Sequence, residues 1–225
     1  MKKTLSALVI CLAAATAAAA QVTTRPKPAT PPAPAEVKDP HAGHQMGQPQ
    51  EPQSPAQKYF SDVELLDQDG RKVRFYTDML KGKTVVVNAF FTTCTSVCPP
   101  MNRNMEKIQE ALGDRLGKEV FLVSISVDPT TDTPPRLKEY AQKFHAKPGW
   151  TFLTGKKENV DWALFKVGQY VESKDDHTTL IIVGNETTGL WKKMLGMAKA
   201  AELIQIVESV ARDKGEASND KGGSK

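Results

Sequence analysis

The chain has 225 residues, of which 25% are charged, and its formal net charge at pH 7 is +4. This small charge, without basic runs interleaved with aromatic residues, argues against a nucleic-acid partner. Three cysteines are too few for a disulfide-rich scaffold, and the length is ample for one domain with a hydrophobic core.

The first twenty residues have the pattern of an export signal. Lys2 and Lys3 precede an apolar run, and small residues ending in Ala20 form an A-x-A-like cleavage site. We expect cleavage after Ala20, a mature charge of 4 − 2 = +2, and a periplasmic location. The alternative is that residues 4–20 are kept as a membrane tether at the outer face of the inner membrane.

The cysteines of the mature chain form a single pair. Cys11 lies inside the signal and follows Ile10, whereas a lipidated cysteine normally follows a small residue, so we assign Cys11 to the discarded signal. Cys94 and Cys98 remain. In an oxidising compartment such a pair forms a disulfide unless a metal or a reductant intervenes.

The two ends of the mature chain are predicted to lie outside the folded domain. Residues 21–57 hold nine of the fifteen prolines and no aromatic residue, which is typical of a disordered linker. Residues 213–225, rich in glycine, serine and lysine, predict a flexible tail. The folded domain is therefore expected over residues 58–212.

Within that domain the apolar pattern predicts an α/β fold. A continuous apolar, β-branched run predicts a strand that is buried on both faces, and spacing of three or four residues predicts a helix. The elements expected in chain order are an N-terminal β-hairpin (63–76), a strand (84–91), a helix (102–116), a strand (120–127), a helix capped by Thr133 (133–145), a short strand (150–153), a short helix (160–167), a second hairpin (179–195) and a closing helix (198–211). This order predicts a central mixed sheet with helices on both faces.

The residues with the clearest chemistry stand where the first buried strand ends. The segment 92–100 reads TTCTSVCPP, and Pro99 and Pro100 suit the first turn of a helix. Cys98 is then at or near the N-cap, where free backbone N–H groups should lower the pKa of its thiol and favour the thiolate.

The spacing of Cys94 and Cys98 suits either a disulfide or a metal ion. Two metal–sulfur bonds of about 2.3 Å place two sulfurs about 4 Å apart. Two thiolates select Cu(I), or zinc if two further ligands are present, and the mature chain has no other cysteine. The alternative is a stabilising disulfide, but closing so small a loop removes little chain entropy.

Four histidines could add an imidazole ligand. His177 follows Asp175 and Asp176, whose carboxylates could orient its ring, and a solvated loop histidine is the alternative. We expect His145 to interact with the C-terminal dipole of its helix. The remaining candidates are His41, His44 and Met46 in the linker, which could bind copper weakly, and Met194 and Met197, which we expect to be packing residues.

Three motifs in the predicted domain are distinctive: FFTTCTSVCPP (90–100), SVDPTTDTP (126–134) and DDHTTL (175–180). In these motifs the chain resembles the Sco/SenC family of copper chaperones, and the resemblance covers about residues 59–210. The resemblance implies a thioredoxin-like fold and one copper ion, Cu(I) or Cu(II), bound by Cys94, Cys98 and His177. Two departures concern finer specificity: Thr95 to Val97 lack the acidic residue that many relatives have between the cysteines, and the strand after His177 lacks their usual Asp-Pro-x-Gly turn.

The resemblance also implies a role in maturation of the CuA centre of cytochrome c oxidase. The expected partners are the apo CuA domain of subunit II, or another exported copper acceptor, and a thiol reductant. Cys94 and Cys98 would be the redox-active pair if copper release is coupled to thiol–disulfide exchange. We expect a non-enzymatic metallochaperone. The alternatives are a thiol–disulfide oxidoreductase or thiol peroxidase acting on exported proteins, with copper incidental, and a redox or metal sensor.

Overall fold

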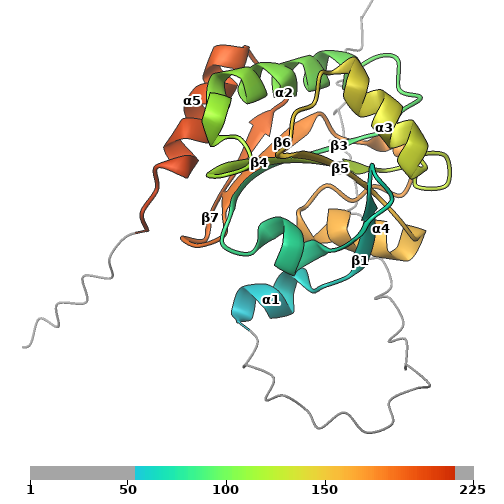
Figure 1. The fold of residues 1–225 in the computed structure, drawn as a ribbon, viewed down its shortest axis with the longest axis horizontal. Helices are drawn as coiled ribbons and strands as arrows, with labels where there is room; N and C mark the ends of the chain where they lie inside the picture. The colour runs from blue at the N-terminus through green and yellow to red at the C-terminus, as the bar shows by residue number, and fades with distance from the viewer. Residues whose placement is uncertain (1–53, 216–225) are drawn as a thin grey trace, which may run out of the picture.

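A seven-stranded mixed β-sheet, in the order β2-β1-β5-β4-β3-β6-β7, forms the centre of the structure (Figure 1). The structure is a computed structural model that describes residues 54–215. Its strands are β1 (Glu64–Asp67), β2 (Lys72–Arg74), β3 (Thr84–Phe90), β4 (Val120–Ser126), β5 (Trp150–Thr154), β6 (Leu180–Asn185) and β7 (Leu190–Leu195). Its α-helices are α1 (Pro55–Phe60), α2 (Cys98–Leu112), α3 (Pro134–Lys143), α4 (Lys157–Lys166) and α5 (Ala200–Ala211).

The sheet is parallel at its centre and antiparallel at its edges. β3 pairs parallel with β4, and β4 pairs parallel with β5. The N-terminal hairpin β1–β2 joins β5 antiparallel, and the hairpin β6–β7 joins β3 antiparallel. Gly70 has a φ of +78° in the first hairpin, which is a conformation that favours glycine in a tight turn.

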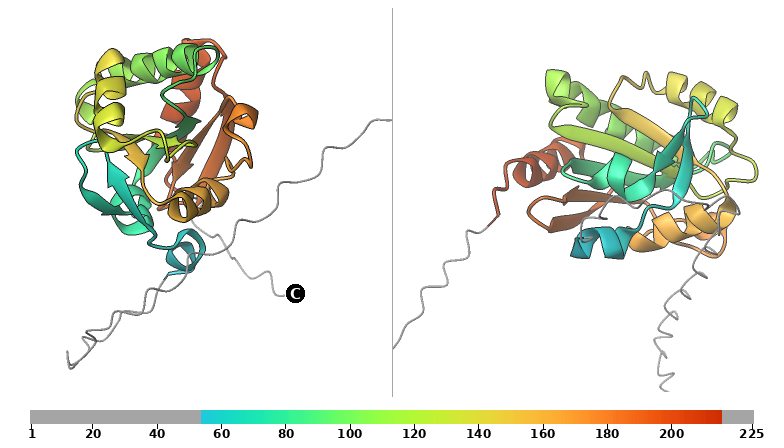
Figure 2. Two further views of the ribbon diagram at one scale, coloured as in Figure 1. Left: turned by 90° about the vertical axis from the view of Figure 1, so that its right-hand side faces the viewer. Right: turned by 60° about the horizontal axis from the view of Figure 1, so that its bottom comes forward.

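Helices cover both faces of the sheet, as the sequence predicted (Figures 1 and 2). Every residue of β3 is buried, and because side chains alternate along a strand, β3 contributes to two cores. Val86 and Phe90 belong to the core beneath α2, α3 and α5. Val85 and Val87 belong to the opposite core, with α1 and α4. This arrangement is a thioredoxin-like α/β fold.

Several helix boundaries differ from those predicted. α2 begins at Cys98 rather than residue 102, because the two prolines occupy its first turn, and it ends at Leu112 before Gly113, whose φ is +54°. α3 ends at Lys143, and the side chain of Thr133 makes no capping hydrogen bond. α4 begins three residues early.

The first helix lies partly within the predicted linker. α1 begins at Pro55, and the Ser54 hydroxyl caps it by accepting a hydrogen bond from the backbone N–H of Gln57 (3.1 Å). Phe60 at its end is buried against Tyr76 and Trp191. The folded part therefore starts before residue 58.

Several predictions concern residues outside the described range. These are the signal, the tether, the linker up to residue 53, the tail beyond residue 215, and the candidate ligands His41, His44 and Met46. Within residues 54–215 no helix is long and apolar enough to cross a membrane.

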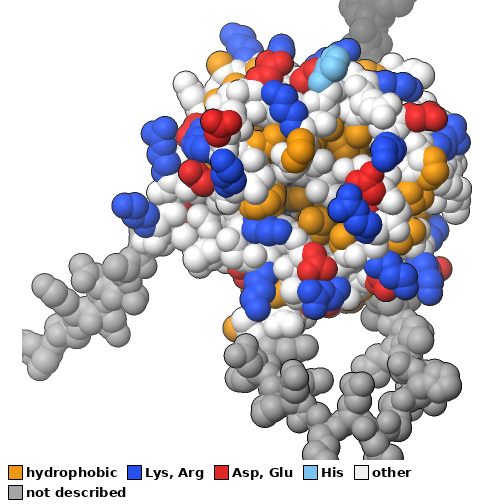
Figure 3. Space-filling model, in the orientation of Figure 1, with side chains coloured by type: hydrophobic (Ala, Val, Ile, Leu, Met, Phe, Trp, Pro, Cys, Tyr) orange, Lys and Arg blue, Asp and Glu red, His pale blue; other side chains and the backbone are white. Residues whose placement is uncertain are grey.

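On the face drawn in Figure 3, lysine and arginine side chains are interspersed with aspartate and glutamate, which gives no extended field of one sign over that face.

Candidate metal centre

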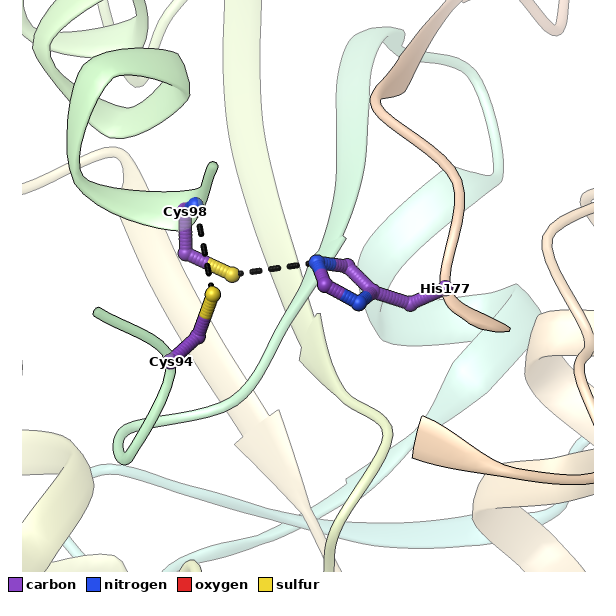
Figure 4. A group of neighbouring side chains, drawn as sticks. All are labelled: Cys94, Cys98 and His177. Carbon is purple, nitrogen blue, oxygen red and sulfur yellow. Dashed lines mark hydrogen bonds between the residues drawn. The ribbon is translucent and has the colours of Figure 1, made fainter. Parts of the chain in front are cut away.

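The two cysteines lie in the turn that joins β3 to α2 (Figure 4). The backbone N–H of Cys94 donates to the carbonyl oxygen of Phe91 (3.1 Å), which folds the loop back after the strand. Cys98 is the first residue of α2, and its backbone N–H donates to Sγ of Cys94 (3.4 Å). Both cysteines are free thiols and are buried, with exposed fractions of 7% for Cys94 and 0% for Cys98.

His177 reaches the cysteines from a loop that is 79 residues distant in sequence from Cys98. Its Nε2 is 3.3 Å from Sγ of Cys98 (Figure 4). The loop leads into β6, which pairs with β3, so the sheet brings the end of one strand beside the start of the other. The ring of Phe91 meets the imidazole edge to face, with centroids 5.1 Å apart.

A backbone carbonyl, rather than a carboxylate, contacts the other nitrogen of His177. Nδ1 is 2.8 Å from the carbonyl oxygen of Lys174, a partner that the sequence did not predict, and the orienting role of the Asp175 and Asp176 carboxylates stays a prediction. Lys174 to Asp176 form a 3₁₀ turn that presents this carbonyl to the ring. In a neutral imidazole, an Nδ1–H that donates to Lys174 leaves Nε2 as the unprotonated nitrogen, which is the form that binds a metal.

The prediction of a lowered pKa for the Cys98 thiol was wrong, and Cys94 has the lowered pKa instead. Burial raises the pKa of Cys98, and the adjacent sulfur of Cys94 raises it further. Burial also raises the pKa of Cys94, but hydrogen bonds from the thiol and backbone of Cys98 and from Ser96 outweigh it, so the net pKa is lowered. The first N–H of α2 points at the sulfur of Cys94, so the helix terminus favours that thiolate instead.

A buried carboxylate holds the start of the cysteine loop. Asp132 is fully buried and accepts hydrogen bonds from the backbone N–H of Thr92 (3.0 Å), the Thr92 hydroxyl and the Ser126 hydroxyl (2.6 Å). It therefore ties the ends of β3 and β4 to the turn before α3. Sequence reasoning missed this role, although Asp132 lies in the motif 126–134.

An ion pair links the histidine loop to the same region. Nζ of Lys174 is 2.7 Å from Oδ2 of Asp128, and it lies 5.4 Å from the centroid of the Phe91 ring. The hydrogen bond to Asp128 raises the pKa of Lys174. Lys174 thus contacts the 128–132 turn with its side chain and His177 with its carbonyl.

The remaining sequence candidates have other environments. His145 lies two residues beyond α3, and its Nδ1 contacts Glu106 of α2 (2.6 Å), a partner that the sequence did not predict; its role at the helix dipole stays a prediction. Met194 is a packing residue, as predicted. Met197 is 50% exposed and is not one.

The three side chains can hold one metal ion. The sulfurs of Cys94 and Cys98 and a ring nitrogen of His177 all lie within 4.8 Å of one another, and they are the only such group of three or more in residues 54–215. Three ligands at about 2.3 Å from one ion in a trigonal arrangement stand about 4 Å apart. Two thiolates and an imidazole suit Cu(I), and three protein ligands leave room for an incoming one.

The fold and this centre define a thioredoxin-like protein in which two thiols and an imidazole lie close enough together to hold one metal ion. A family model described as SCO1/SenC matches residues 51–212, and the chain belongs to this family. Structure comparison found a SCO1/SenC family lipoprotein from Bacillus anthracis, 31% identical, covering 66% of this chain and 92% of that one with a TM-score of 0.57.

Two further solved structures are similar to this chain. ScoI of Bradyrhizobium japonicum with copper bound is 26% identical and covers 67% of this chain and 98% of that one, with a TM-score of 0.55. BsSco is described with a disulfide switch and as a member of the Sco family of cytochrome c oxidase assembly proteins. It is 26% identical and covers 68% of this chain and 92% of that one, with a TM-score of 0.56. The chain spans about half the length of the curated relatives it matches.

Proposed function

We propose that this protein is a copper metallochaperone for the CuA centre of cytochrome c oxidase, and that Cys94, Cys98 and His177 bind one copper ion. The observation that carries the proposal is the convergence of these three donors from two loops far apart in sequence. The copper-bound relative of similar fold supports the choice of metal, and the description of BsSco supports the assembly role.

The dithiol gives the site a way to couple copper release to redox chemistry. In the reduced state both sulfurs are available to copper. When a disulfide of the partner is reduced, Cys94 attacks as a thiolate and forms a mixed disulfide, and Cys98 then displaces the partner's sulfur. The partner gains two thiols and this chain gains one disulfide, so two electrons pass between them. A disulfide no longer offers two thiolates, and copper leaves.

The location that fits this role is the periplasm, with the alternative of a tether kept at residues 4–20. A lipoprotein among the solved relatives supports an exported, membrane-associated form for this family. The recipient would be the apo CuA domain of subunit II, or another exported copper acceptor, and a thiol reductant would restore the dithiol.

The test is a Cu(I) titration of the reduced protein, purified from a periplasmic fraction, against a competing chelator. We expect one tightly held copper ion, its loss in Cys98→Ser, and an affinity at least about tenfold weaker in His177→Ala because one of three ligands is absent. His145→Ala is the matched control, since His145 lies on the surface against Glu106. Equal affinity of the two histidine variants would show that His177 is not a ligand.

The second candidate function is thiol–disulfide exchange with copper incidental, and the unequal thiols favour it. A thiol with a lowered pKa beside one with a raised pKa suits an attacking and a resolving cysteine. Turnover of a disulfide or peroxide by metal-free protein, unchanged in His177→Ala, would establish this function in place of the first.

A further inference from the structure

Two exposed apolar side chains lie at the end of the sheet that carries the candidate metal centre. Among residues 54–215 three large hydrophobic side chains are strongly exposed: Tyr59 at 53%, Leu195 at 66% and Met197 at 50%. Single exposed hydrophobic residues are common on protein surfaces. Leu195 and Met197 differ from such isolated residues because both lie next to the histidine loop.

Strand register fixes that position. Ile181 of β6 lies opposite Asn88 of β3 and opposite Met194 of β7. Leu195 is therefore one residue further toward the end of the sheet at which β3 enters the cysteine loop. The residue paired with Leu195 on the neighbouring strand β6 is Leu180, which lies three residues after His177.

The turn that carries the two side chains is held against the His177 loop and against α2, the helix that begins at Cys98. The backbone N–H of Gly196 donates to the carbonyl oxygen of Thr179 (2.6 Å) in the His177 loop. From α2, Nδ2 of Asn104 donates to the carbonyl oxygens of Gly196 (2.8 Å) and Ala198 (3.0 Å). A Cβ at Gly196 would lie 2.7 Å from the Thr179 oxygen and 2.9 Å from Cγ of Met101, so the close approach requires glycine. Leu195 and Met197 are thus fixed beside the site and form what we call the 195/197 patch.

The burial of the sulfurs explains why a partner would cover this patch. Cys98 is fully buried and Cys94 nearly so, whereas His177 is only half-buried. A copper ion bound there can leave only by ligand exchange with groups that come within about 2.3 Å of it. A protein that supplies such a ligand must contact the His177 loop, and Gly196 joins the 195/197 patch to that loop. Interface cores are depleted in charged residues and enriched in methionine and aromatic residues.

We propose that the 195/197 patch is the docking surface for the copper-accepting domain, which covers Leu195 and Met197 with apolar side chains of its own. This inference rests on the proposed function and goes beyond it by assigning the residues that recognise the recipient. Neither residue is a metal ligand, so the patch affects the encounter with the partner and not the affinity for copper.

The experiment compares copper transfer from the loaded wild-type protein and from the double variant Leu195→Ser/Met197→Ser. The acceptor is the apo CuA domain of cytochrome c oxidase subunit II, at concentrations below saturation. We expect the second-order rate constant of transfer to fall by about tenfold or more, which is the size of effect found for buried apolar anchors of an interface. Transfer to a small Cu(I) chelator, which needs no docking, should proceed at the wild-type rate.

Tyr59→Ser is the matched control, because it removes a similarly exposed large side chain from α1, away from the centre. Wild-type transfer rates in the double variant would overturn the docking role, as would an equal loss in Tyr59→Ser. A loss that occurs equally with the small chelator would assign the effect to the metal site and would also overturn it. A wild-type protein that holds copper but passes none to the CuA domain would instead overturn the proposed recipient, and the patch with it.

Discussion

At the scale of single residues, Cys94 and Cys98 occupy one turn but differ in acid–base character. Cys98 is the more deeply buried, and burial disfavours its thiolate. The backbone N–H of Cys98 donates to the sulfur of Cys94, which favours the thiolate there. In the metal-free protein the Cys94 thiol therefore has the lower pKa and is the expected nucleophile, whereas the Cys98 thiol loses its proton less readily.

Alkylation of the metal-free, reduced protein tests this difference. In Cys98→Ser, Cys94 should react with iodoacetamide with a pH midpoint below the ordinary thiol value of 9.0. In Cys94→Ser, Cys98 should react at least about tenfold more slowly at pH 8, since each unit of pKa changes the thiolate fraction about tenfold. Mass spectrometry of the labelled peptides gives the rates. Faster labelling of Cys98 than of Cys94 would reverse the assignment of roles.

At the scale of elements, the sequence predicted those strands and helices whose apolar pattern lies within one continuous stretch of residues. β3 and β4 were recognised because most of their residues are apolar, and nearly all of them are buried. α1 was missed because it is six residues long and is held by contacts of Phe60 with Tyr76 and Trp191, which are distant in sequence. The carbonyl of Lys174 at His177 could not be predicted, since a backbone group has no sequence signature.

Sequence alone selected the two cysteines as site residues, because they stand at the end of a buried strand. His177 was selected only through the family resemblance. Its approach to Cys98 depends on the pairing of β6 with β3, and sequence alone does not specify that pairing. Asp132 illustrates the same limit. It lies in a recognised motif, but its contact with Thr92, 40 residues earlier, exists only in the folded chain.

The Asp132 contacts predict that this turn supports both folding and the metal centre. Asp132→Asn removes a charged acceptor of three hydrogen bonds, so the free energy of unfolding should fall by about 1–3 kcal/mol. Cu(I) affinity should fall as well, because Thr92 anchors the loop that carries Cys94. Urea denaturation and the chelator titration measure the two effects. Asp114→Asn, at an exposed position, is the control, and an equally small effect of both substitutions would remove the anchoring role.

At the scale of the whole molecule, a copper ion would join two loops that the polypeptide separates by 79 residues. In the metal-free, reduced protein the sheet and a few side-chain contacts, such as those of His177 with Cys98 and Phe91, hold these loops together. The folded chain offers three converged ligands, whereas the unfolded chain offers only two nearby cysteines. Copper should therefore bind the folded state more tightly, and by linkage it should raise the free energy of unfolding.

With free Cu(I) buffered at 1,000 times the wild-type dissociation constant, the free energy of unfolding should rise by about 4 kcal/mol, less whatever binding the unfolded cysteines retain. At the same free Cu(I), His177→Ala should gain clearly less, because its folded state has lost a ligand while its unfolded state has not. His145→Ala should gain as much as wild type, and protein with a Cys94–Cys98 disulfide should gain nothing. Urea unfolding at matched free Cu(I) measures all four. If the oxidised protein were stabilised as much as the reduced one, copper would be binding elsewhere on the chain, and release could not depend on the redox state of this pair.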